Sequence, residues 1–137
     1  MKVITIHNPW AYWISLGIKK IETRIHNKFK NLINQRIAIH ASKAFDTQAL
    51  SLAENFVSAE YLKFDEHIES MHYGAIVCTA FVADHRLLTT DDSREACFHC
   101  RDNQYYGLIL ESVKMLEKPY FCKGYQGQWN IDANLLH

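Results

Sequence analysis

A short stretch near the start of the chain, residues 17–24 with sequence GIKKIETR, combines cations with one carboxylate. Side chains alternate along an extended strand, so Glu22 and Arg24 share one face and Thr23 points to the other. Lys19 joins that face only if the glycine before it starts a turn or bulge, which a glycine favours. Ammonium, carboxylate and guanidinium groups held together can bind phosphate or polarise a carbonyl. The alternative is a row of surface ion pairs on an edge strand.

The protonation state of Lys19 decides which chemistry this cluster can perform. A neighbouring carboxylate such as Glu22 raises the pKa of a lysine, so we expect a cation that binds an oxyanion or phosphate. Amide hydrolysis, with Lys19 and Glu22 as the catalytic pair, stays an alternative because a lysine of lowered pKa serves as a general base. For RNA cleavage, His40 or His7 could act as acid or base near neutral pH, although a histidine at a strand end is more often structural.

Aromatic and acidic residues elsewhere in the chain extend the candidate site. Trp10 and Trp129 could stack on a nucleobase, the alternative being that both pack in the core. Glu111 lies in the middle of a long apolar segment and either faces the cleft or faces solvent. The run CFHC at residues 97–100 has the spacing of half a zinc site, but the chain has no second cysteine pair to complete four ligands. We therefore expect no metal and no cofactor.

Composition limits the class of protein. The chain has 137 residues, of which 48% are hydrophobic and 22% charged, as expected for a single folded domain spanning residues 1–137. No apolar run approaches the ~20 residues that span a bilayer, and no secretion signal is visible, so we expect a soluble cytoplasmic protein that does not contact membranes.

Charge is balanced overall but unevenly distributed. A protein that coats long nucleic acid is usually basic, and this chain has a formal net charge of zero. Residues 19–43, however, contain seven Lys or Arg and one acid, whereas residues 46–72 contain six acids and one Lys. The first segment predicts a local positive patch. The second leaves open a protein-interaction adaptor with an acidic contact surface.

Periodicity and turn residues predict an α+β fold in which strands outnumber helices. Expected strands cover residues 1–6, 19–25, 36–40, 75–88, 105–116 and 128–131. Expected helices cover residues 9–16, 46–57 and 59–71, with a further short helix beginning at 91 or 92. This order favours a mixed sheet curled toward a barrel, with helices packed on its outside.

Three motifs together resemble the ASCH domain family. They are Asn8-Pro9-Trp10-Ala11 before a helix, the set Gly17, Lys19, Glu22 and Arg24, and Ile39-His40-Ala41-Ser42-Lys43. The ending Gly127-Gln128-Trp129 is similar to the family's terminal strand. The resemblance implies a PUA-like β-barrel of five to six mostly antiparallel strands with helices packed around it. It also implies that RNA, a nucleoside or a nucleotide is the partner, bound in a cleft between the first helix and the barrel.

The predicted ligand-binding residues follow from the motif and the residue-level reasoning combined. They are Trp10, Lys19, Glu22, Arg24, His40, Lys43, Glu111 and Trp129. One branch that is similar to this motif hydrolyses the acetyl amide of N4-acetylcytidine, with the lysine equivalent to Lys19 and a threonine among its catalytic residues. This chain has Glu22 where that branch has threonine. Binding of a nucleotide or RNA is thus the first expectation, and amide hydrolysis or RNA cleavage is the alternative.

Overall fold

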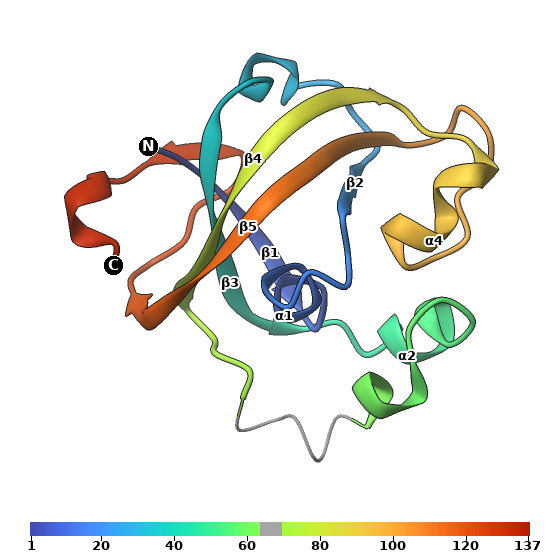
Figure 1. Ribbon diagram of the computed structural model, residues 1–137, viewed down its shortest axis with the longest axis horizontal. Helices are drawn as coiled ribbons and strands as arrows, with labels where there is room; N and C mark the ends of the chain where they lie inside the picture. The colour runs from blue at the N-terminus through green and yellow to red at the C-terminus, as the bar shows by residue number, and fades with distance from the viewer. Residues whose placement is uncertain (64–69) are drawn as a thin grey trace.

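A six-stranded sheet forms the frame of the molecule in the computed structural model, which describes residues 1–63 and 70–137. The strand order is β2-β5-β4-β3-β1-β6, and all neighbours are antiparallel except β1 and β3, which are parallel (Figure 1). The strands are β1 (Lys2–Asn8), β2 (Ile21–Arg24), β3 (Arg36–Phe45), β4 (Ala75–Leu87), β5 (Tyr106–Phe121) and β6 (Gln128–Asn130). This confirms the α+β class with a mostly antiparallel sheet. Closure into a barrel stays a prediction, because the pairings of the described strands leave β2 and β6 as separate edges.

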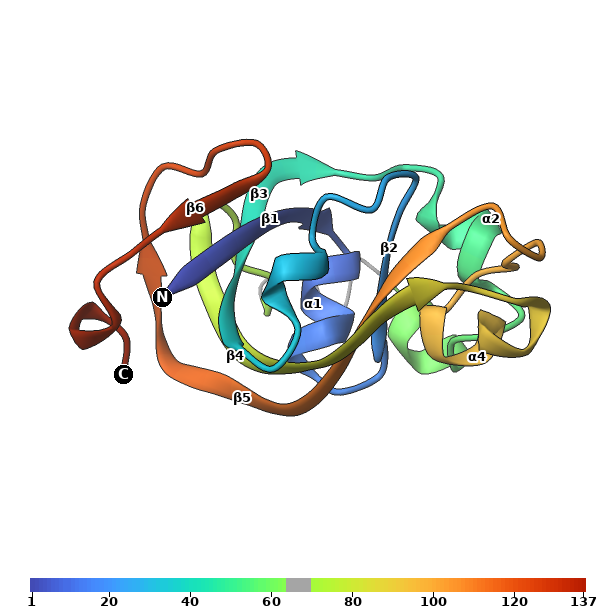
Figure 2. The same ribbon diagram turned by 90° about the horizontal axis from the view of Figure 1, so that it is seen from above.

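The sheet curves around helix α1 (Trp10–Ser15), as the view from above shows (Figure 2). Alternation on β1 explains this packing: Ile4 and Ile6 face the helix, where they meet Ile14 in the main apolar cluster. Val3 points to the other face and packs with Trp129 near the chain ends. One strand therefore contributes to two cores, and α1 fills the concave side of the sheet.

Two further helices lie together at one end of the sheet (Figure 1). They are α2 (Ala49–Ala53) and α4 (Ser93–Ala96), and single 3₁₀ turns occur at Lys30–Leu32, Ala59–Leu62, Thr90–Asp92 and Ala133–Leu135. Of the helix expected over residues 59–71, only the turn Ala59–Leu62 is present, and residues 64–69 lie outside the described part of the chain. Part of the acidic segment considered as an adaptor surface is therefore also outside it.

Two strands are longer than periodicity predicted. β3 continues to Phe45, where a helical lead-in was expected, because Phe45 pairs with Asn8 of β1. β5 continues past Pro119 to Phe121, because the pairing with β4 shifts register between Ile76 and Cys78 and a proline is tolerated at such an irregularity. Non-local pairing thus overrides local sequence signals at both strand ends.

No helix among the described residues has the length and apolar character needed to cross a membrane.

Candidate functional site

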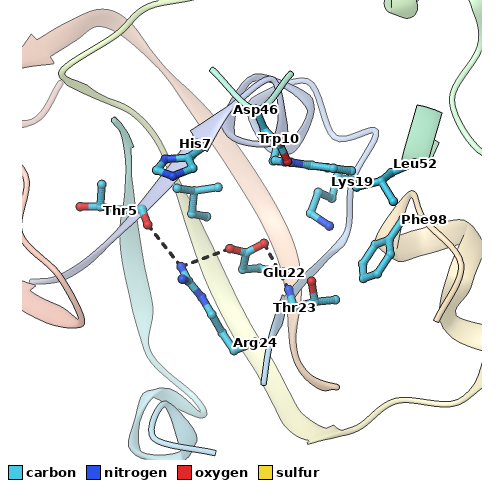
Figure 3. A pocket seen from close by; sticks show the side chains of 11 residues that line it. Thr5, His7, Trp10, Lys19, Glu22, Thr23, Arg24, Asp46, Leu52 and Phe98 are labelled. Atoms are coloured by element: carbon cyan, nitrogen blue, oxygen red, sulfur yellow. Dashed lines mark hydrogen bonds and ion pairs between the residues drawn. The ribbon is translucent and has the colours of Figure 1, made fainter. Parts of the chain in front are cut away.

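The turn between α1 and β2 aims Lys19 toward Glu22 and Arg24. Gly17 has a φ of 77°, a left-handed conformation that suits glycine, and the next two amides both donate to the carbonyl of Trp13. β2 begins only at Ile21, so Lys19 precedes the strand and does not follow its alternation. As a result, Lys19, Glu22 and Arg24 line a common hollow of about 300 Å³, called here the first hollow (Figure 3).

Lys19 is a buried cation inside an aromatic and carbonyl cage. Its side chain is 2% exposed and its ammonium donates to the carbonyl of Ala96. The Nζ atom lies 5.0 Å from the ring centre of Trp10 and 5.6 Å from that of Phe98. Burial lowers the pKa of Lys19 and outweighs the Glu22 carboxylate, which raises it. The expectation that Glu22 would raise the pKa overall is therefore wrong, because sequence reasoning did not foresee this burial.

Glu22 and Arg24 form an ion pair at the bottom of the first hollow. Arg24 Nη2 lies 3.2 Å from Glu22 Oε2 and donates to the carbonyl of Thr5, also at 3.2 Å (Figure 3). Glu22 is 6% exposed, and its Oε1 accepts from the amide of Thr23 at 3.1 Å. Arg24 Nε is buried and has no hydrogen-bond partner among the described residues, so one donor of this guanidinium is unsatisfied.

The aromatic wall of the first hollow comes from two distant parts of the chain. Trp10 opens α1, and its Nε1 donates to Asp46 Oδ2 at 2.8 Å, which fixes the ring beside Lys19. Phe98 follows α4 and meets Trp10 edge-on at 6.2 Å. Sequence reasoning missed Phe98 and Asp46, since nothing local indicates that these segments fold back onto β2. Thr23 also lines the hollow, and its backbone amide donates to Glu22 Oε1 there.

His40 and Lys43 lie in a different, larger hollow. This second hollow has a volume of about 1070 Å³ and is formed by β3 and the segment 121–127 that leads from β5 to β6. It shares Thr5, His7 and Arg24 with the first hollow. The predicted site residues are therefore divided between two adjoining hollows, with Arg24 between them.

Two more predicted site residues line neither hollow. Trp129 packs edge-on against His40 at 5.5 Å and against Tyr125 at 5.3 Å, and its Nε1 donates to Thr5 Oγ1 at 3.1 Å. It therefore supports the wall of the second hollow from behind. Glu111 is exposed on β5, opposite Phe81, and is not among the lining residues of either hollow.

The environment of His40 favours the neutral imidazole. Its side chain is 2% exposed, and Nε2 lies 2.9 Å from the carbonyl of Cys122, which requires the proton to be on Nε2. Burial lowers the pKa of His40, and the bond to Cys122 opposes this only in part. Nδ1 is buried and unpaired among the described residues. His40 thereby ties β3 to the segment after β5.

The cysteine-rich turn after α4 serves packing in this structure. Cys97 and Cys100 are buried free thiols, whereas His99 is exposed. Within residues 1–63 and 70–137, no three His, Cys, Asp or Glu side chains come together as metal ligands would. Cys97 has a φ of 66°, and this left-handed turn places Phe98 beside Lys19.

Comparison with known proteins bears on the fold. No protein-family model and no curated protein sequence matches the chain. In structure, the chain is similar to the ASCH protein from Zymomonas mobilis, with a TM-score of 0.58 and 13% identity over 98% of this chain and 89% of that one. Two mutants of the Zymomonas protein are also similar, with TM-scores of 0.52 and 0.51, identities of 15% and 14%, and coverage of 88% of this chain and 72% and 74% of theirs. Likeness at such low identity is a likeness of fold, and this chain has the fold of an ASCH domain.

Proposed function

We propose that the protein binds a nucleobase-containing ligand, either a free nucleotide or one nucleotide of an RNA, in the first hollow. The observation that carries the proposal is the burial of Lys19 and Glu22 beside the partly exposed Arg24, in a concavity with aromatic walls. Burying ionisable groups is costly, so such a cluster in a hollow is a candidate functional site. The volume of about 300 Å³ lies at the small end of ligand pockets and suits a single nucleotide.

Each group has a role that its chemistry suits. The partly exposed guanidinium of Arg24 and the ammonium form of Lys19 bind phosphate or carbonyl oxygens, because charge-assisted hydrogen bonds are strong. Glu22 accepts a hydrogen bond from an exocyclic amine of the base. Trp10 and Phe98 offer aromatic surface to the base.

A binding screen with matched variants tests the proposal. Wild-type protein is titrated with the common nucleosides, nucleoside monophosphates and a short single-stranded RNA. We expect Lys19→Ala to weaken the affinity of every ligand that binds by about tenfold, or roughly 1.4 kcal/mol. Lys114→Ala, an exposed lysine on β5, is the matched control and should leave the affinity unchanged. Affinity that survives both Lys19→Ala and Arg24→Ala would contradict the proposal.

The lowered pKa of Lys19 favours a second candidate, a hydrolase acting on an acylated nucleoside. A neutral amine at Lys19 can take the proton of a water that attacks the acetyl carbon of N4-acetylcytidine. Lys19 then returns this proton to N4 as the carbon–nitrogen bond breaks, which releases cytidine and acetic acid, and the acid loses its own proton to solvent to give acetate. Incubation with N4-acetylcytidine, followed by chromatography, tests this directly. No turnover at high protein concentration excludes the hydrolase. Incubation with a labelled RNA, followed by the same chromatography, reveals cleavage if the protein is a ribonuclease.

A further inference from the structure

The second hollow is larger than a site for a single nucleotide needs to be, and most of its lining residues differ from those of the first hollow. Its volume of about 1070 Å³ is more than three times the 300 Å³ of the first hollow. Its walls are β3, the end of β5 and the segment leading to β6, so it extends along the sheet away from Lys19. The two hollows share Thr5, His7 and Arg24 as lining residues and therefore adjoin at that border.

The charge lining the second hollow is positive. Arg24, Lys43 and Lys123 line it, and no Asp or Glu is among its described lining residues. Lys43 and Lys123 are exposed and have no ion pair among the described residues. Because the whole chain has a net charge of zero, this is a local concentration of cations, complementary to phosphates.

Exposed aromatic rings stand beside these cations. Phe121 is 67% exposed and Tyr125 is 53% exposed, and both line the second hollow, so their rings are accessible to a ligand there. Lys123 Nζ lies 5.5 Å from the ring centre of Tyr125, so the cation and the stacking surface are adjacent. Cations that follow a backbone, with aromatic rings for the bases, are the two components of a single-stranded nucleic-acid groove.

We propose that the second hollow binds the nucleotides adjoining the one held in the first hollow, so that the ligand is a single-stranded oligonucleotide and not a free nucleotide. This rests on the proposed function, since it requires a nucleotide beside Lys19. Arg24 sits at the border and contacts the phosphate that links the two sites. Lys43 and Lys123 bind the following phosphates, and Tyr125 or Phe121 stacks on a following base.

The test compares two probes on the full chain: nucleoside monophosphates, and a fluorescein-labelled single-stranded RNA of about eight nucleotides. We expect the RNA to bind wild type at least tenfold more tightly than any monophosphate. The double variant Lys43→Ala/Lys123→Ala should lose about tenfold in RNA affinity. Its slope of log affinity against log salt should be shallower by about 1.4, because two phosphate contacts, and the counterions that each contact releases, are lost. Its affinity for the monophosphates should stay within about twofold of wild type.

The control is Lys114→Ala/Lys118→Ala, which removes two exposed lysines of β5 that line neither hollow. It should leave the RNA affinity unchanged. A second measurement needs no variant: in amide NMR spectra of wild type, Gly124 and Tyr125 should shift with the RNA and not with a monophosphate.

The outcomes separate this inference from the proposed function. If monophosphates bind in a Lys19-dependent way but the RNA binds no more tightly, the second hollow is not a subsite and the proposed function survives. The inference is also overturned if the Lys43 and Lys123 variant keeps full RNA affinity, or if it loses both probes equally. If neither probe binds wild type, the proposed function itself fails.

Discussion

Lys19 is the residue on which the chemistry of the first hollow depends. It is enclosed by the carbonyl of Ala96 and the rings of Trp10 and Phe98, with Glu22 in the same hollow. The Glu22 carboxylate favours the cation, whereas exclusion of water favours the neutral amine, and burial is the larger effect. Burial of Lys19 therefore carries a stability penalty.

Replacing Lys19 with methionine should make that penalty measurable. Because the folded-state pKa is below the ordinary 10.5, the unfolded chain binds the proton more tightly than the folded protein does. The free energy of unfolding of the wild type should therefore increase as pH rises from the lowered pKa of Lys19 toward 10.5. The Lys19→Met variant lacks this increase. We expect the free energy of unfolding of the variant, minus that of wild type, to be most positive near neutral pH and to shrink as pH rises. Urea denaturation across a pH series measures this.

Lys20→Met provides the control, since Lys20 is exposed and its substitution should give a difference that does not change with pH. A difference for Lys19→Met that grows with rising pH would mean that Lys19 is stabilised as a cation, as sequence reasoning alone had expected.

At the scale of elements, the grouping of Lys19, Glu22 and Arg24 in the first hollow was predictable because its determinants are local, whereas the walls contributed by Asp46 and Phe98 were not. The turn at Gly17 and the alternation of Glu22 and Arg24 both depend on consecutive residues. The structure brings the Lys19, Glu22 and Arg24 side chains together as that pattern indicates. The second hollow was not predictable. It depends on the parallel pairing of β1 with β3 and on the return of residues 121–127 to β3, both of which join distant parts of the chain.

The same division explains the misplaced residues. His40 and Lys43 belong to a motif that suggested one site, but β3 continues to Phe45 and carries them beside Cys122 and not beside Lys19. Phe98, which no motif indicated, reaches Lys19 through a left-handed turn after a four-residue helix. Short connecting elements with weak periodicity therefore determine the part of the site that sequence could not reveal.

Close packing of the segment after β5 against His40 gives a prediction for Gly124→Ala. An added Cβ would lie 2.5 Å from His40 Cε1 and 2.6 Å from its Nδ1. The ring cannot move away freely, because its Nε2 donates a hydrogen bond to the carbonyl of Cys122 and Trp129 packs against it. We expect a loss of about 1–3 kcal/mol in the free energy of unfolding, measured by urea denaturation.

The control for this substitution is Gln126→Ala, an exposed position in the same segment, which should change the stability little. In addition, the double variant Gly124→Ala/His40→Ala should be less destabilised than the sum of the two single variants, because the ring that clashes is gone. Purely additive losses would show that the segment does not pack on His40 in this way.

At the scale of the whole molecule, the two ends of the chain close one side of the sheet. The amino group of Met1 donates to the carbonyl of Ile131 at 2.9 Å, and the amide of Ile131 donates back to Met1 at 3.0 Å. β6 covers the edge of β1 (Figure 2). Trp129 and Ile131 pack on the cluster around Val3. The last ten residues thus protect both an unpaired strand edge and an apolar face.

Truncation after Gly127 should therefore cost stability far from the first hollow. It removes β6 and uncovers Val3. The two half-buried side chains that are lost, Trp129 and Ile131, together contribute about 3 kcal/mol or more to stability. We expect the thermal midpoint to fall by about 10 °C, measured by circular dichroism, and the truncated protein to associate through the exposed edge of β1. Truncation after Ile131 retains β6 and Trp129 and should lose much less. Equal midpoints for the full chain and the truncation after Gly127 would show that the sheet is stable without this edge strand.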